Sequence, residues 1–333
     1  MDSKTYPKEL KTALEAVAEA SKICEAVGNE ARAASLEKND RSPVTIADYG
    51  SQALIQRRLY ETFSGVSFIS EEDASALKQP ENSTLLNRLV DYVNKIRPYS
   101  DAEDVLNWID WGKAEQDPDY FWTLDPIDGT KGFLRGDQYA ISLCLVVGGE
   151  LKVAALGCPR LSTTGGDDDG KTGVIFGAVA GEGAFQLDDL GGEPKPIHVS
   201  DITDVTQIRF TESVEKAHSS HSDSARIAEH LGIVAKPVRI DSQAKYAAVS
   251  RGDGDVYLRL PRDNVYREKI WDHAGGALVV TEAGGRVTDI KGRPLNFFKG
   301  YRLEENLGVI VTNGHVHDAV LDAIRTLGIG NFE

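Results

Sequence analysis

The chain has 333 residues, of which 41% are hydrophobic and 27% charged, and its formal net charge is −15. These proportions are ordinary for a globular protein, and the length is sufficient for a large core and two domains. The negative charge argues against a nucleic-acid polymer or an anionic membrane as partner, although bound cations would still permit a small anionic substrate.

Cysteine usage and the N-terminal segment bear on the cellular compartment. Cys24, Cys144 and Cys158 are widely spaced, which argues against a disulfide framework or a zinc site and favours a reducing compartment. No apolar run approaches the roughly 20 residues of a membrane span, and the first residues lack the character of a signal or transit peptide. We therefore expect a cytoplasmic protein, or an organellar one from which a targeting peptide has been removed.

In the first half, the pattern predicts helices followed by antiparallel strands. Residues 8–28 have the apolar spacing of an amphipathic helix, and residues 42–46, Ser-Pro-Val-Thr-Ile, indicate a turn and a short β-prone run before a helix starting near Asp48. A short strand is expected at residues 66–70. Residues 74–120 are expected to form a helical insertion near the site, referred to below as the helical excursion. Further strands are expected at residues 122–124, 139–147, 151–159 and 174–180, with Gly148-Gly149 as a hairpin turn and 165–170 as a solvated loop tip.

The second half alternates between strands and helices, which is typical of an α/β layer. Strands are expected at residues 208–210, 238–240, 255–260 and 309–311, and helices at 223–231, 243–250, 272–283 and 318–327. The composition turns to Gly and Pro near residues 190–196. We therefore predict an N-terminal α+β domain at residues 1–195 and a C-terminal α/β domain at 196–333.

The most informative stretch is residues 125–130, Asp-Pro-Ile-Asp-Gly-Thr, at the end of a buried strand. Pro126 cannot donate to a β-ladder, so Asp125 is expected where the strand stops. Gly129 permits a tight turn, and Thr130 is a suitable cap for the next element. The stretch is either an Asp-rich surface turn or a site for a divalent metal and phosphate at a strand end.

Acidic residues at three other places also have an ordinary structural interpretation. Residues 71–73, Glu-Glu-Asp, follow a short apolar strand and are either a solvated charge run or a source of further metal ligands. Asp48 and Asp272 precede predicted helices, where capping is the usual role of aspartate. His273, next to Asp272, is expected to be structural.

In order and separation, these segments resemble the magnesium-dependent, lithium-sensitive inositol monophosphatase superfamily. The resemblance rests on residues 71–73, on 125–130, and on Trp-Asp-His-Ala-Gly-Gly at 271–276 with Glu-Ala-Gly-Gly at 282–285. Further motifs resemble the 3′(2′),5′-bisphosphate nucleotidases of that superfamily; they lie at residues 42–48, 131–135, 213–221, 241–246 and 257–261. The resemblance implies a layered αβαβα sandwich of the inositol monophosphatase and fructose-1,6-bisphosphatase type, mixing α+β and α/β character.

The resemblance also implies a function. The expected reaction is hydrolysis of the 3′(2′)-phosphate of adenosine 3′(2′),5′-bisphosphate, with the 5′-phosphosulfate analogue as a second candidate substrate. A water activated by two to three Mg²⁺ ions would attack in line. The implied metal ligands are Glu71, Asp125, the Ile127 carbonyl, Asp128 and Asp272; the implied catalytic pair is Asp48 and Thr130; the implied substrate contacts are Gly129, Thr130, His218, Ser242, Lys245 and Arg259.

Two other functions remain open from the sequence. An inositol polyphosphate 1-phosphatase would share the metal ligands but would need no surface for adenine. A non-catalytic nucleotide-binding sensor would not need Asp48 and Thr130 beside a full set of metal carboxylates. The sequence does not fix an oligomeric state, and a monomer is compatible with it.

Overall fold

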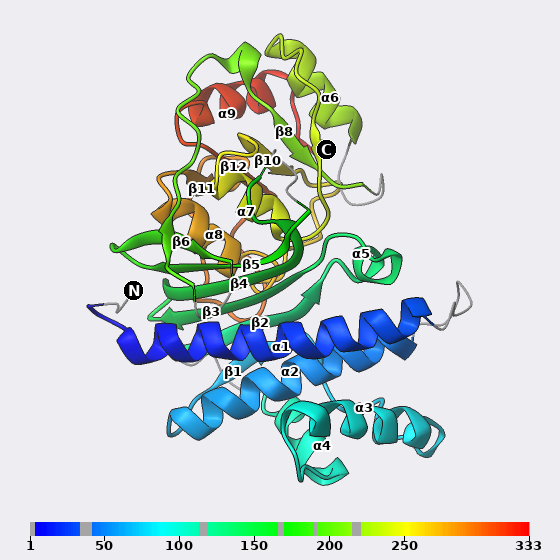
Figure 1. The fold of residues 1–333 in the computed structure, drawn as a ribbon. Coiled ribbons are helices and arrows are strands. Elements are labelled where there is room, and N and C mark those ends of the chain that lie inside the picture. The colour runs from blue at the N-terminus through cyan, green and yellow to red at the C-terminus, as the bar shows by residue number, and fades with distance from the viewer. Residues whose placement is uncertain are drawn as a thin grey trace.

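The computed structural model describes residues 4–33, 42–112, 119–165, 170–188, 192–214 and 221–332. Helices and sheets alternate in five layers, αβαβα (Figure 1). The outer helices α1 and α2 cover one sheet, α7 and α8 lie between the two sheets, and α6 and α9 cover the second sheet. The layered sandwich implied by the resemblance is therefore confirmed. The helices of these layers are α1 (Pro7–Ala33), α2 (Ser42–Thr62), α6 (His221–His230), α7 (Ala244–Ser250), α8 (Ala274–Glu282) and α9 (His317–Thr326).

Seven strands of the described chain form the larger sheet, in the order β1-β2-β3-β4-β5-β6-β7. Neighbouring strands are antiparallel, as predicted, except that β1 and β2 run parallel. The strands are β1 (Phe68–Ser70), β2 (Tyr120–Asp128), β3 (Ala140–Val147), β4 (Glu150–Ser162), β5 (Thr172–Val179), β6 (Gly183–Leu187) and β7 (Lys195–Pro196).

The smaller sheet is mixed and has the order β11-β12-β10-β8-β9 in the described residues. Strand β8 pairs in parallel with β9 and β10, whereas β12 is antiparallel to β10 and β11. The sequence pattern missed β11 and placed β8 two residues too early. The strands are β8 (Phe210–Glu212), β9 (Val238–Arg239), β10 (Val256–Arg259), β11 (Arg286–Thr288) and β12 (Val309–Thr312).

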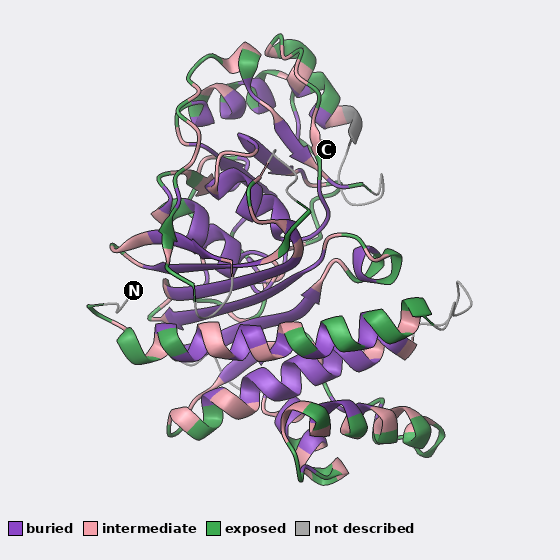
Figure 2. Cartoon of the chain, in the orientation of Figure 1, coloured by how far each residue is buried: buried purple, intermediate pink, exposed green. Residues whose placement is uncertain are grey.

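Alternation along the strands distributes apolar side chains between separate cores. In β3, Leu143 and Leu145 join the core beneath α1 and α2, whereas Cys144 and Val146 join the core beneath α7 and α8. Successive side chains of a strand point to opposite faces, so a sheet covered on both faces is apolar on both. Figure 2 shows the resulting burial along both sheets.

Between β1 and β2 the chain makes the predicted helical excursion, with α3 (Ser83–Ile96) and α4 (Ala102–Asp110). The three cysteines are buried and form no disulfide. None of the helices in the described ranges is both long and apolar enough to cross a membrane.

The prediction of a turn and β-prone run at residues 42–46 was wrong. These residues form the first turns of α2, and Asp48 lies inside the helix rather than at its start. Pro43 is tolerated because the first turn of a helix needs no backbone N–H there. Val44 and Ile46 are buried in the core shared with α1, and this burial outweighs their weak β preference.

Strand β2 also extends beyond its predicted end. It continues through Pro126 to Asp128, with a shift in its pairing to β3 between Asp125 and Asp128. Proline cannot donate to a ladder, and it is tolerated here because the register is irregular. The division into domains at residues 1–195 and 196–333 stays a prediction.

Candidate active site

A pocket of about 230 Å³ opens where the end of β2 meets segments from the second half of the chain. Its lining combines carboxylates with cationic side chains. Of the predicted site residues that the structure describes, all except Asp48 line it. The lining residues are Glu71, Asp125, Ile127, Asp128, Gly129, Thr130, Lys131, Gly132, Ser213, Asp241, Ser242, Lys245, Tyr257, Arg259, Asp272 and His273.

Parallel pairing of β1 with β2 brings the first two acidic segments together. Ser70, the last residue of β1, is in register with Leu124, and the N–H of Glu71 donates to the Leu124 carbonyl at 3.2 Å. Two parallel strands end at the same edge of a sheet, so Glu71 leaves β1 beside Asp125.

After β2 the chain turns sharply into the short helix α5 (Thr130–Arg135). Gly129 has φ +90° and occupies the N-cap position, so Thr130 is the first helical residue and not the predicted cap. A Cβ at Gly129 would lie 2.9 Å from the Cβ of Ser242, which itself has φ +66°. Glycine is needed here both for the left-handed backbone and for the close approach of the second half.

Side chains of helix α2 hold the two acidic segments that follow β1 and end β2. The Gln52 side chain accepts a hydrogen bond from the N–H of Glu72 at 3.1 Å and donates to the Glu72 carbonyl at 2.7 Å. Ser51 donates to the Pro126 carbonyl at 3.0 Å. Both acidic segments are thus fixed to the same helix, which also carries the buried Asp48.

The carboxyl groups raise one another's pKa values. Burial, followed by the charges of Glu71 and Asp128, raises the pKa of Asp125 well above its ordinary value. Burial and the charge of Asp128 do the same for Asp272.

The pKa values of Asp48 and Glu71 are raised as well. Burial and the neighbouring Glu72 raise the pKa of Asp48 well above its ordinary value. Loss of surrounding water, followed by the charge of Glu72, raises the pKa of Glu71 to about 7, although this side chain opens to solvent at the pocket. When these carboxyl groups are ionised, they therefore repel one another.

These residues fit a bound divalent cation. The buried atoms Oδ1 of Asp48 and Oδ1 of Asp125 have no hydrogen-bond partner within the described part of the chain. A buried carboxylate oxygen without a partner is costly. Hard cations such as Mg²⁺ take oxygen ligands of this kind and would offset the repulsion.

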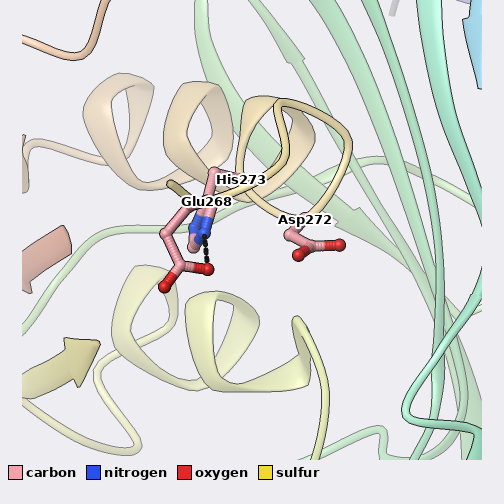
Figure 3. Close-up of side chains that lie close together, drawn as sticks. All are labelled: Glu268, Asp272 and His273. Carbon is pink, nitrogen blue, oxygen red and sulfur yellow. Dashed lines mark hydrogen bonds and ion pairs between the residues drawn. The ribbon is translucent and has the colours of Figure 1, made fainter. Parts of the chain in front are cut away.

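Glu268, Asp272 and His273 also place one possible ligand atom each within 4.8 Å of one another. Figure 3 shows that Glu268 and His273 face each other, whereas the Asp272 carboxylate points away from the pair. Glu268 Oε2 lies 3.3 Å from His273 Nε2, and Glu268 also pairs with Arg259 at 3.1 Å. Because these partners already satisfy Glu268, we assign Asp272 to the carboxylates on the pocket side.

His273 has the structural role that its position suggested. Its Nδ1 lies 2.7 Å from the Tyr246 hydroxyl, and both groups are buried. The expected capping role of Asp272 was wrong, because α8 begins at Ala274 with His273 at its N-cap position.

Two of the basic residues, Lys245 and Arg259, come from the second half. Lys245 on α7 is buried, and its Nζ donates to Ser213 Oγ at 3.2 Å and lies 5.1 Å from the centre of the Tyr257 ring. Burial, partly opposed by the charge of Asp128, lowers the pKa of Lys245 to about 8. Arg259 ends β10 and remains 23% exposed. Lys131 of α5 lines the same pocket, which therefore holds carboxylates together with three Lys and Arg side chains.

Asp241 fixes this basic region to the end of β2. It forms an ion pair with Arg135 of α5 and accepts a hydrogen bond from the N–H of Val214 at 2.9 Å. Ser242, the next residue, lines the pocket beside Gly129.

The roles predicted for the site residues, as metal ligands, catalytic pair and substrate contacts, all stay predictions, and two of them are further from the geometry described above. Residues 215–220 lie outside the described residues, and with them the predicted nucleotide contact His218. Thr130 is exposed at the pocket, whereas Asp48 is buried in α2, so their pairing stays a prediction.

A sequence profile of the Inositol monophosphatase family matches residues 7–328. The chain is 43% identical to a 3′(2′),5′-bisphosphate nucleotidase of Oryza sativa, covering 96% of this chain and 94% of that protein. It is 40% identical to a 3′(2′),5′-bisphosphate nucleotidase of Schizosaccharomyces pombe, covering 96% and 95%.

The chain belongs to the inositol monophosphatase family. Its fold resembles that of an inositol monophosphatase from Anabaena, with a TM-score of 0.63 at 21% identity, covering 96% of this chain and 95% of that one. This membership confirms the superfamily resemblance and makes the chain a hydrolase, a phosphatase that acts on a small phosphate-bearing molecule. The family is generally metal-dependent, in agreement with the acidic cluster.

Several residues that support the site were missed by sequence reasoning. Gln52 and Glu268 belong to no motif, and Glu268 lies in the run Arg-Glu-Lys, which looks like a solvated surface segment. Gln243 lies within the motif at residues 241–246, but no role was predicted for it. Their roles arise from contacts with distant segments. For Gln52 and Glu268 the sequence therefore contained no local signal, whereas for Gln243 the motif at 241–246 was such a signal.

Proposed function

We propose that this phosphatase hydrolyses the 3′(2′)-phosphate of adenosine 3′(2′),5′-bisphosphate, giving AMP and phosphate. The observation that carries the proposal is one pocket lined by carboxylates together with Lys245 and Arg259. Such a pocket suits a substrate with two phosphates, one beside cation-binding carboxylates and the other beside cationic side chains. The names of the rice and fission yeast relatives support the same substrate.

We propose Mg²⁺ as the cation, with two to three ions per site. The ligands would be the side chains of Glu71, Asp125, Asp128 and Asp272 and the carbonyl of Ile127. Bound there, the ions would stabilise negative charge that develops on the phosphate and would make water a stronger nucleophile.

The protein's own groups are proposed to move the proton and orient the phosphate. Burial raises the pKa of Asp48, which makes its carboxylate a stronger base, as a proton acceptor requires. The Thr130 hydroxyl would bind the attacking water and relay its proton to Asp48. The N–H groups of Gly129 and Thr130 would bind phosphate oxygens as in-line attack proceeds, without a covalent phosphoenzyme.

Recognition of the nucleotide is proposed to rest on the second half of the chain. Lys245 and Arg259 would bind the 5′-phosphate, and Ser242 would contact the nucleotide beside Gly129. His218 remains part of the proposal, although it lies outside the described residues.

The deciding experiment measures phosphate release from adenosine 3′,5′-bisphosphate, its 5′-phosphosulfate analogue and inositol 1,4-bisphosphate, with Mg²⁺ and with EDTA. We expect Mg²⁺-dependent turnover that is fastest with the nucleotide. Faster turnover of the inositol compound would indicate an inositol polyphosphate 1-phosphatase instead. Tight nucleotide binding without turnover would indicate a sensor.

A further inference from the structure

Glu268 is a buried carboxylate beside the pocket that contacts one of its cations. Its two oxygens lie 3.1 Å and 3.2 Å from Nε of Arg259. The hydrogen bond from His273 and the charge of Arg259 outweigh burial and lower the pKa of Glu268 to about 2, so the group is ionised at neutral pH. The Tyr266 side chain also hydrogen-bonds Arg259. Since Glu268 contacts Nε, the terminal nitrogens of Arg259 are the part suited to hold a phosphate bidentately.

Besides a narrow hollow of about 10 Å³ beside Phe210, Arg259 borders two larger spaces. It lines the pocket, and it also lines a second hollow of about 290 Å³ together with Leu260, Pro261, Arg262, Asp263, Tyr266 and Glu268. A long side chain between two open spaces has rotamers that point into either one, and ordering it costs conformational entropy. A fixed charged partner can select one orientation before substrate arrives.

Glu268 is itself held in place from the opposite side. His273 Nε2 lies 3.3 Å from its Oε2, and the other nitrogen of His273 lies 2.7 Å from the hydroxyl of the fully buried Tyr246. Figure 3 shows the Glu268–His273 contact beside the start of α8. Tyr246 follows Lys245 in α7, so this network connects Lys245 with Arg259.

We propose that Glu268 is a positioning residue for recognition of the second phosphate: it anchors Arg259 at Nε and thereby directs the terminal nitrogens of Arg259 to the 5′-phosphate. This inference rests on the proposed function. Glu268 does not touch substrate in this scheme. Its effect should therefore depend on whether the substrate carries a 5′-phosphate.

The test compares adenosine 3′,5′-bisphosphate with adenosine 3′-monophosphate in the wild type and in Glu268→Gln. Glutamine keeps the shape but removes the charge that anchors Arg259. We expect kcat/KM for the bisphosphate to fall about tenfold, mainly through KM, as for loss of one charge-assisted hydrogen bond. For the monophosphate we expect kcat/KM to change less than about twofold, since no 5′-phosphate is present.

Two further variants keep the test decisive. Glu61→Gln breaks a surface pair with Arg57 of 2.8 Å and should leave both substrates unaffected. If Glu268→Gln does not fold, Glu268→Asp keeps the charge on a shorter side chain and should show the same selective loss at smaller size. Thermal unfolding monitored by circular dichroism establishes that each variant is folded.

A double-mutant cycle identifies the route of the effect. Arg259→Lys alone should lower kcat/KM for the bisphosphate, and adding Glu268→Gln to it should lower kcat/KM little further. Suppose that the wild type prefers the bisphosphate. The positioning role alone would then be overturned if Glu268→Gln lost kcat/KM equally for both substrates, if it lost none, or if its loss added to that of Arg259→Lys. A wild type without that preference would overturn the proposed substrate, and the positioning role with it.

Discussion

The N–H of Glu71 donates a hydrogen bond of 3.2 Å to the carbonyl of Leu124, the residue before Asp125. This contact continues the parallel pairing of β1 with β2 by one residue. It places two carboxylates at one sheet edge, although about fifty residues separate them in the chain. The cation site proposed for this family member depends on that edge, and the first two predictions concern it.

Asp125→Asn should abolish turnover without loss of fold, because it removes one charge from the cluster at nearly constant shape. We expect turnover to fall by more than roughly a hundredfold, the upper range for changes that only support a metal site. Stabilisation by Mg²⁺ in thermal unfolding should disappear as well. Asp322→Asn, which alters a surface pair with Arg325, is the matched control. Wild-type turnover by Asp125→Asn would refute the assignment of Asp125 as a metal ligand.

The stability of the metal-free protein should fall as pH rises between about 4.5 and about 7. The pKa of Glu71 is raised across this window by loss of surrounding water and by Glu72, so the folded state binds more protons there than the unfolded state. Deprotonation then creates repulsion that folding must overcome. The pKa values of Asp48, Asp125 and Asp272 are raised too, so these groups contribute with the same sign.

The measurement is the unfolding temperature in EDTA and in Mg²⁺ across this pH range. Mg²⁺ should remove the decline, because it binds the ionised carboxylates. Asp125→Asn should make the EDTA curve flatter. A metal-free protein that becomes more stable as pH rises through the window would contradict the mutual repulsion.

Binding of the bisphosphate should weaken above about pH 8. Burial lowers the pKa of Lys245 to about 8, so the side chain is cationic below this value and neutral above it. We expect KM for adenosine 3′,5′-bisphosphate to rise on the alkaline side, whereas KM for adenosine 3′-monophosphate stays nearly constant.

Lys245→Arg provides the control for this pH profile, because arginine stays charged. It should keep KM for the bisphosphate flat at alkaline pH, even if KM is higher throughout. An identical alkaline rise in the wild type and in Lys245→Arg would assign the effect to another group.

Gln243→Leu should destabilise the fold and also weaken metal binding. The Gln243 side chain accepts hydrogen bonds from Ser142 at 2.9 Å and from the N–H of Gly276 at 3.3 Å, and donates to the carbonyl of Trp271 at 3.0 Å. It therefore connects β3 with the segment that carries Asp272. We expect a loss of roughly 3 kcal/mol in the free energy of unfolding, since buried groups are left without partners.

Urea unfolding and Mg²⁺ titration by calorimetry measure the two effects of Gln243→Leu. Ser142→Ala removes only one of the three contacts and should cost about 1 kcal/mol. Unchanged Mg²⁺ affinity in a folded Gln243→Leu variant would show that this side chain does not position Asp272.

The sequence by itself determined much of the fold and the acidic half of the site. Long periodic segments such as α1 and the β3–β4 hairpin were predicted because their apolar spacing matches one face of a helix or the alternation of a strand. Residues 125–130 were informative because proline, glycine and two aspartates restrict the backbone within six positions.

Only the tertiary structure decided what holds these residues in place. The helix at 42–46, the buried position of Asp48 and the continuation of β2 through Pro126 follow from burial against α1 and from pairing with β3. Glu268 and Gln243 acquire their roles through contacts with segments distant in sequence. Local residue pattern reports which groups could do chemistry, whereas packing between distant segments fixes which of them meet and in what orientation.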